Sequence, residues 1–154
     1  SQLMVGCHAY AETSALTVQL VEKTTEILPG HVLVAPVDQH ILIHGNKVYL
    51  DDRPPVLFQK PSVDVLFESA ARNFGSRLLG VLLTGMGRDG AKGCVSIVEH
   101  GGVTLVQDQA TSAIFGMPKA AIEMGGASKV FPLQKIAGYL LEFVHGVSCT
   151  DGES

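Results

Sequence analysis

The segment 78–102, LLGVLLTGMGRDGAKGCVSIVEHGG, holds the residues whose types and order best fit a chemical site. An apolar strand over Leu78–Thr84 runs into the glycine-rich turn GMGRDG, and a helix follows that stops at Gly101–Gly102. One acid, Asp89, lies in the turn at the carboxyl end of the strand. Ligands bind at this end of the strands in open α/β sheets, so the sequence predicts a functional site around Asp89.

Asp89 has two roles open to it in this position. Its carboxylate can cap the helix that starts at Gly90 by accepting backbone N–H groups, and we expect this role in any case. It can also orient a catalytic histidine in a Ser-His-Asp site, where the acid holds one imidazole tautomer and stabilises its cation. The chain contains no G-x-S-x-G nucleophile turn. We interpret Ser62 as a helix cap and Ser112 as a loop residue.

The same turn also matches the dinucleotide-binding pattern G-x-G-x-x-G through Gly85, Gly87 and Gly90. Asp108 closes the next strand about 20 residues further on, where that pattern places an acid. However, the pattern normally opens the first βαβ unit of its fold. Here a hairpin and a proline-rich loop precede it, and little chain follows Asp108. A dinucleotide-binding fragment therefore stays as the more distant alternative, and a titration with NAD tests it.

Composition excludes several classes of protein. The 154 residues are 46% hydrophobic and 17% charged, which is typical of one globular domain. With 11 Lys+Arg and a net charge of −4, the chain lacks the basic surface of a nucleic-acid-binding protein. No apolar run is long enough to span a membrane, and no signal peptide is recognisable. The three cysteines are widely spaced, as in reduced cytoplasmic proteins.

Strands and helices alternate along the chain, which predicts a three-layer α/β/α fold with a mainly parallel sheet. The two-residue loop Gly45-Asn46 predicts one β-hairpin as the antiparallel exception. Apolar residues of 3.6 period predict a helix over Val63–Phe74, capped by Ser62 and ended by Gly75. The other expected elements are strands at Ala15–Val21, His31–Pro36, Ile41–His44, Lys47–Asp51, Val103–Gln107 and Lys129–Phe131, helices at Pro118–Met124 and Leu133–Val144, and an irregular crossing at Arg53–Pro61.

Several long motifs in a fixed order resemble the catalytic domain of the CheB-type protein-glutamate methylesterases of bacterial chemotaxis. The resemblance covers about residues 14–142 and is far more specific than one glycine pattern. The segments that carry it are LPGHVLVAPVDQHILI (28–43), KPSVDVLFESAA (60–71), GVLLTGMGRDGAKG (80–93), GGVTLVQDQATSAIFGMPKAAIEMGGAS (101–128) and the closing helix from Leu133.

Members of that family hydrolyse glutamate methyl esters on chemoreceptors and often deamidate receptor glutamines, using a Ser-His-Asp triad. The resemblance implies that Asp89 is the acid of this triad. It also implies that Thr84, Gly85, Met86 and Gly87 lie beside the substrate cleft. It implies no cofactor, and no set of His, Asp and Glu residues has metal-ligand spacing.

The chain departs from the family at its start. The family's serine, in a G-x-S-x-G-G turn, and its histidine both precede the part that matches here. Residues 1–13, SQLMVGCHAYAET, contain neither motif, and His8 lacks the family's flanking residues, so we assign it no role. We therefore expect residues 1–146 to form a partial catalytic domain that is inactive alone, with a flexible tail at 147–154. The first alternative is a non-catalytic receptor-interaction module of the same fold.

The resemblance also implies partners. They are methylated cytoplasmic segments of chemoreceptors and, in a longer protein, an N-terminal receiver domain; the expected location is the cytoplasm. A fold without its first βαβ portion exposes a strand edge near Ala15–Val21, so we expect self-association there. His40 matches a histidine of the family, and we expect it to have a structural role or to form a wall of the cleft.

Overall fold

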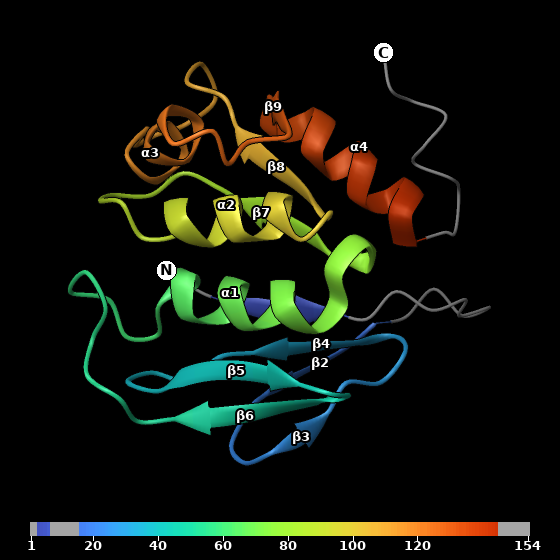
Figure 1. Cartoon of the computed structure of the whole chain (residues 1–154). Helices are drawn as coiled ribbons and strands as arrows, with labels where there is room; N and C mark the ends of the chain where they lie inside the picture. Colours follow the sequence, from blue (N-terminus) through green and yellow to red (C-terminus); the bar gives the residue numbers. More distant parts are fainter. Residues whose placement is uncertain (1–2, 7–15, 145–154) are drawn as a thin grey trace.

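The computed structural model describes residues 3–6 and 16–144, and it confirms the α/β class (Figure 1). Most of the expected elements occur within a residue or two of their predicted bounds. The strands are β1 (Met4–Gly6), β2 (Thr17–Leu20), β3 (Thr25–Glu26), β4 (His31–Val34), β5 (His40–His44), β6 (Lys47–Asp51), β7 (Leu79–Leu82), β8 (Val103–Gln107) and β9 (Lys129–Phe131), and the helices are α1 (Val63–Phe74), η1 (Gly75–Arg77), α2 (Ala91–Glu99), α3 (Met117–Glu123) and α4 (Leu133–Val144).

The described strands are divided over three sheets, in the orders β1-β4-β2, β3-β6-β5 and β7-β8-β9. The last sheet is entirely parallel, and β2 also pairs with β4 in parallel. The hairpin β5–β6 is antiparallel as expected. Two further antiparallel pairs, β1–β4 and β3–β6, were not predicted. Because β1 and β3 have only three and two residues, they are too short to show a periodic pattern.

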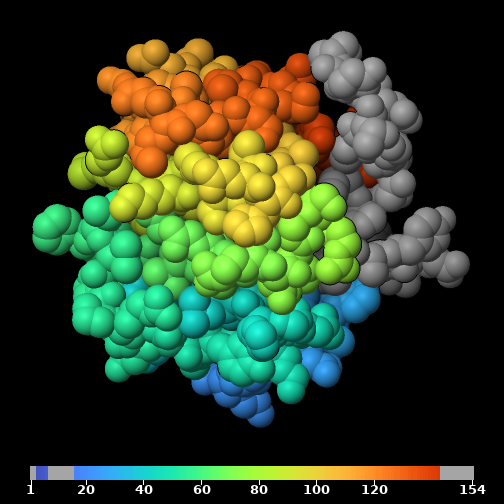
Figure 2. Space-filling view, in the orientation of Figure 1, coloured from blue at the N-terminus to red at the C-terminus, as the bar shows by residue number. Residues whose placement is uncertain are grey.

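Helices α1 and α2 pack side by side between two halves of the molecule (Figure 1). In the space-filling view, the green residues of α1 separate the blue and cyan strands from the yellow and orange residues (Figure 2). Gly93 allows the two helices to approach closely, because a Cβ atom at this position would lie 2.6 Å from Phe67 Cβ. This packing brings the N-terminal ends of α1 and α2 together.

Helix α1 has the bounds and the caps that the sequence predicts. The hydroxyl of Ser62 accepts a hydrogen bond from Val65 N at 3.4 Å, and Gly75 ends the helix with φ of 55°. The buried side of α1 includes Val63, Leu66 and Ala70, which belong to the main hydrophobic core. The start of α1 is therefore stabilised by the hydrogen bond to its capping residue and by packing against the core.

Some expectations fall on residues outside the described part of the chain. These are the tail at 147–154 and the region of His8. Within the described residues, no helix is long and apolar enough to cross a bilayer. The same part of the chain contains no group of three or more His, Cys, Asp and Glu side chains that could hold a metal ion.

Candidate functional site

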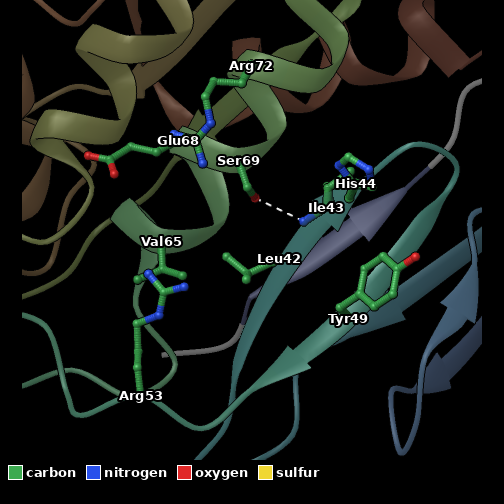
Figure 3. A pocket seen from close by; sticks show the side chains of 9 residues that line it. All are labelled: Leu42, Ile43, His44, Tyr49, Arg53, Val65, Glu68, Ser69 and Arg72. Carbon is green, nitrogen blue, oxygen red and sulfur yellow. Dashed lines mark hydrogen bonds between the residues drawn. The ribbon is translucent and has the colours of Figure 1, made fainter.

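A cavity of about 410 Å³ lies between α1 and the hairpin β5–β6 (Figure 3). One of its charged side chains, Arg53, is already bound to Asp51 by two hydrogen bonds of 2.8 and 3.0 Å. These hydrogen bonds lower the pKa of Asp51 to about 2. None of the residues predicted to do chemistry lines the cavity. Its lining residues are Leu42, Ile43, His44, Tyr49, Arg53, Val65, Glu68, Ser69 and Arg72.

The predicted acid, Asp89, lies instead at the carboxyl end of β7, between the N-termini of α1 and α2. Only 2% of its surface is exposed. Its carboxylate accepts three hydrogen bonds: from Ser62 Oγ (2.7 Å) and Asp64 N (3.0 Å) to Oδ1, and from Val63 N (2.7 Å) to Oδ2. Asp89 therefore caps α1, a helix that begins 26 residues before it.

The prediction that Asp89 caps the helix starting at Gly90 is wrong. Gly90 itself occupies the N-cap position of α2, with φ of 100°. Glycine has no side chain, so the N-cap residue makes no side-chain cap hydrogen bond. The donors of α2 are satisfied by Asp64 of the other helix, whose Oδ1 accepts from Gly90 N (3.0 Å) and Gly93 N (2.8 Å). The two helices thus cap each other, because their N-termini meet when α1 and α2 pack together.

The two carboxyl groups differ in how well they are satisfied. Both hydrogen bonds to Asp64 reach Oδ1, and its buried Oδ2 has no partner among the described residues. Burial raises the pKa of Asp64; the hydrogen bond from Gly93 N opposes this, and the nearby carboxylate of Asp89 adds to it. Burial also raises the pKa of the neighbouring Cys94 thiol to about 12, with a smaller effect from Asp64. Cys94 is therefore not activated as a nucleophile.

The arrangement leaves Asp89 able to accept one more hydrogen bond. A carboxylate oxygen can accept two, and among the described residues Oδ2 of Asp89 accepts only the one from Val63 N. An acid that is fixed by three donors and keeps one lone pair unused can hold the N–H of an imidazole in one orientation. This is the chemistry that the geometry of Asp89 supports.

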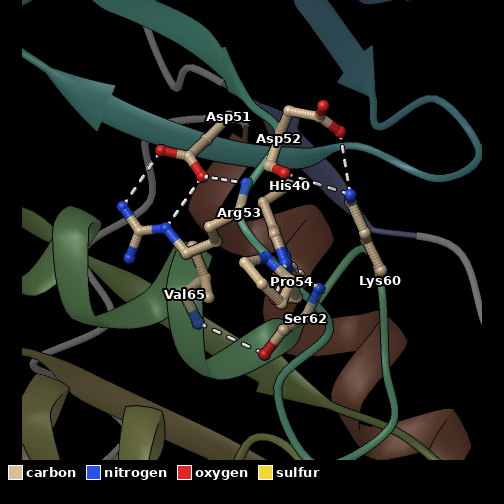
Figure 4. Close-up of polar contacts among 8 residues, drawn as sticks. All are labelled: His40, Asp51, Asp52, Arg53, Pro54, Lys60, Ser62 and Val65. Carbon is tan, nitrogen blue, oxygen red and sulfur yellow. Dashed lines mark hydrogen bonds and ion pairs between the residues drawn. The ribbon is translucent and has the colours of Figure 1, made fainter.

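His40 is not that imidazole. It is fully buried; its Nδ1 accepts from Ser62 N at 3.1 Å, and its Nε2 lies 3.0 Å from the carbonyl oxygen of Pro54 (Figure 4). These partners assign the neutral tautomer with the proton on Nε2. His40, Ser62 and Asp89 are contiguous, but the Ser62 hydroxyl donates to the acid and not to the histidine. The group is a structural support and not a nucleophilic triad.

The segment from Thr84 to Gly87 is braced by the loop before α3. Oγ1 of Thr84 accepts from Ile114 N and donates to Ile114 O, at 2.8 and 3.0 Å. The backbone N–H of Thr84 donates to Oε1 of buried Gln107 at 2.8 Å. Gly85 O accepts from the backbone of residues 116 and 117, and Met86 is 72% exposed. The loop that carries the predicted cleft residues is thus held firmly while Met86 faces outward.

The same contacts weigh against a dinucleotide site in this turn. A pyrophosphate needs the free N–H groups at the start of the helix. Here Gly90 N and Gly93 N already donate to Asp64, and Gly85 N donates to Ile114 O. Asp108 is also engaged, since its Oδ1 accepts from N and Oγ1 of Thr111.

The fold and the position of Asp89 define an α/β domain with a buried, hydrogen-bonded acid at the carboxyl end of a parallel sheet. The family to which the chain belongs is that of the CheB methylesterases, whose model matches residues 7–140. The chain is 47% identical over 132 residues to a protein-glutamate methylesterase/protein-glutamine glutaminase of Anaeromyxobacter dehalogenans, covering 86% of this chain and 39% of the relative. It is 49% identical over 120 residues to one of Pseudomonas aeruginosa, covering 75% and 34%.

The crystal structure of the CheB methylesterase catalytic domain of Thermotoga maritima is similar to this chain, with a TM-score of 0.76 and 37% sequence identity. The match covers 82% of this chain and 69% of that domain. The chain thus spans well under half of the curated relatives and about two thirds of the solved catalytic domain.

Proposed function

We propose that this chain supplies the triad acid and part of the substrate cleft of a protein-glutamate methylesterase. The substrates are glutamate methyl esters, and also glutamines, on cytoplasmic segments of chemoreceptors. The observation that carries this proposal is the carboxylate of Asp89, which is buried and fixed by three donors, and whose Oδ2 accepts one hydrogen bond from the described residues where it can accept two. The relatives are named for this reaction, which supports the choice.

In this reaction Asp89 orients a histidine supplied from outside the described residues. That histidine removes the proton of a serine hydroxyl as the serine oxygen bonds to the ester carbonyl carbon. The bond to the methoxy oxygen then breaks, and the methoxy group leaves as methanol with the proton from the imidazolium. Water hydrolyses the acyl-serine by the same proton transfers. A glutamine side chain releases ammonia in place of methanol.

The acid alone does not perform this reaction. We expect the 154-residue chain to release no methanol from a methylated receptor fragment, because Asp89 cannot act as nucleophile or base. We expect turnover once the chain is extended at its N-terminus with the corresponding segment of the Anaeromyxobacter relative. A serine-directed fluorophosphonate should abolish that turnover. If the extended chain binds the receptor fragment without releasing methanol, the chain is a non-catalytic interaction module of the same fold.

The wider setting of the protein is also part of the proposal. The longer relatives leave room for further domains, and we assign one of them to an N-terminal receiver domain that regulates the esterase in the cytoplasm. The domain bounds 1–146, with a tail at 147–154, belong to the same proposal.

Self-association is proposed for the edge formed by β2. All four residues of this strand are exposed, and Leu16, Val18 and Leu20 present apolar side chains there. Unpaired apolar edges favour pairing with a second copy. Analytical ultracentrifugation of the 154-residue chain should show a dimer or larger assembly. A monomer over a wide range of concentration contradicts this part of the proposal.

A further inference from the structure

The loop between β6 and α1 contains a two-residue turn with an unusual composition. Val56 and Gln59 face each other across the turn and exchange backbone hydrogen bonds of 3.0 and 2.9 Å. The two residues between them are Leu57 and Phe58, with φ of 50° and 66°. Positive φ at both central positions is the conformation that Asn-Gly adopts most readily. For Leu and Phe it is unfavourable, because the Cβ atom crowds the backbone.

The side chains of this turn also do not stabilise the fold. Phe58 is 98% exposed and Leu57 is 48% exposed, so neither contributes much buried apolar area. The backbone conformation therefore costs stability, and the exposed side chains contribute little burial to offset it. A pair of large apolar side chains in such a turn is explained by contact with something outside the described chain.

The turn is presented on a firm base. Lys60 Nζ is 2.8 Å from Oδ1 of Asp52, and its side chain is only 15% exposed (Figure 4). Two residues further on, Ser62 is fully buried and bound to both His40 and Asp89. The turn is thus preformed, which reduces the entropy that binding must overcome.

The turn lies beside the proposed catalytic site. Three residues separate Phe58 from Ser62, whose hydroxyl contacts Asp89, so the two Cα atoms are within about 14 Å of each other. The loop 52–62 stands out on the same side of the molecule as the β7–α2 turn with exposed Met86 (Figures 1 and 2).

A protein substrate that places a side chain beside Asp89 lies close to this turn. A standard protein–protein interface buries about 800 Å² on each partner, which equals a disc of about 16 Å radius. A disc of that radius centred on Ser62, whose hydroxyl contacts Asp89, includes Phe58. Exposed aromatic side chains on a firm backbone are typical anchors at such interfaces.

We propose that the Leu57–Phe58 turn is a docking element that inserts into an apolar groove on the surface of the protein substrate, beside the glutamate to be hydrolysed. This inference rests on the proposed function, since it uses that function's substrate. The inference adds that part of the free energy of binding the protein substrate comes from an element outside the triad. The turn therefore affects the affinity for a protein substrate and leaves the chemistry on a small ester unchanged.

The test is the double substitution Leu57→Asn with Phe58→Gly in the N-terminally extended chain. We expect a higher melting temperature, because Asn-Gly relieves the backbone conformation. With a methylated receptor cytoplasmic fragment, KM should rise about tenfold or more at similar kcat. With a small glutamate γ-methyl ester, kcat/KM should stay within about twofold. The control is Leu141→Asn, which removes a 60% exposed apolar residue of α4 and should leave the KM, kcat and kcat/KM values unchanged.

An unchanged KM for the receptor fragment, with turnover intact, overturns the docking element while leaving the proposed function in place. An equal loss on the small ester overturns it too, because the turn would then act on the chemistry. If the double substitution changes KM only in a protein that also carries the N-terminal receiver domain, the turn contacts that domain and not the substrate. If the unsubstituted extended chain hydrolyses neither substrate, the proposed function fails. Binding of the receptor fragment, measured by calorimetry, then decides whether the turn docks it.

Discussion

The N-termini of α1 and α2 are capped in the same way but with different results. Each helix receives a carboxylate from the other: Asp89 caps α1, and Asp64 caps α2. Asp89 uses both oxygens and a serine hydroxyl to reach three hydrogen bonds, which compensate its burial. Asp64 uses one oxygen and leaves the other without a partner. The number and direction of donors, and not burial alone, distinguish the acid suited to hold a base from the acid that only joins two helices.

The largest effect is expected from Asp89→Asn. Both oxygens of Asp89 face backbone N–H donors, so either orientation of an amide places an NH₂ group against one of them. We expect turnover of the extended chain to fall by up to about 10⁴-fold, the loss that this change causes in the serine-protease triad. The 154-residue chain should also lose about 1–3 kcal/mol of stability in urea unfolding. Near-full turnover in this variant would show that Asp89 is only a cap.

The second prediction tests the packing that brings the two helix ends together. Gly93→Ala places a Cβ atom 2.6 Å from Phe67 Cβ and 3.3 Å from Asp64 Oδ1, so the helices must move apart. We expect a loss of about 1–3 kcal/mol in the free energy of unfolding. Gly138→Ala in α4 is the matched control, because nothing lies within 4 Å of its new Cβ atom. That change should raise stability by up to about 1 kcal/mol. Equal effects of the two substitutions would contradict the close approach at Gly93.

Ser62→Ala sharpens the comparison by removing one donor from Asp89, together with the cap hydrogen bond from Val65 N to the Ser62 hydroxyl. We expect kcat of the extended chain to fall about tenfold with little change in KM, because the acid is then less firmly held. Ser69→Ala is the control: this serine is also buried in α1, but it bonds Ile43 N and Leu66 O and not Asp89. Both variants should lose similar stability. A kcat loss shared by both would assign it to general destabilisation.

Asp64→Asn should have the smallest effect at neutral pH but change the pH dependence of stability. Folding raises the pKa of Asp64 above 3.8, its value in the unfolded chain, so the folded state binds the proton more tightly. The stability from this proton is complete below pH 3.8 and is lost as pH rises through the folded pKa. In the unsubstituted chain, the free energy of unfolding should therefore fall as the pH rises through the folded pKa of Asp64. Asp64→Asn should remove this fall.

The control for this last prediction is Asp51→Asn. Arg53 lowers the pKa of Asp51 to about 2, so its contribution has the opposite sign. It is present above pH 3.8 and is lost as pH falls toward 2. Urea unfolding at a series of pH values measures both variants. Identical pH profiles for Asp64→Asn and the unsubstituted chain would show that Asp64 keeps its ordinary pKa.

The sequence predicted what depends on local pattern. The bounds of α1, its caps Ser62 and Gly75, and the hairpin at Gly45-Asn46 follow from spacing and turn chemistry over a few residues. The place of Asp89 at the end of a parallel strand also followed. Its partner did not, because the contact with α1 joins residues about 26 apart and depends on how two helices pack. Asp64 was missed for the same reason.

The turn at Leu57 and Phe58 was missed for a different reason. Its residues contradict the turn type that they adopt, so turn chemistry could not find it. Such conflicts between local preference and structure are expected at sites of function. The mismatch is therefore informative once the structure is known, and only then.

The reciprocal caps also bear on how the site appears during folding. Neither helix end is complete until the other has docked, so the two N-termini should open and close as one cooperative unit in hydrogen exchange. A chain with α1 or α2 detached has no oriented acid, because the donors that hold Asp89 belong to α1. In partly folded forms of the chain, Asp89 therefore lacks the donors that orient its carboxylate, and it gains them only when α1 and α2 have docked.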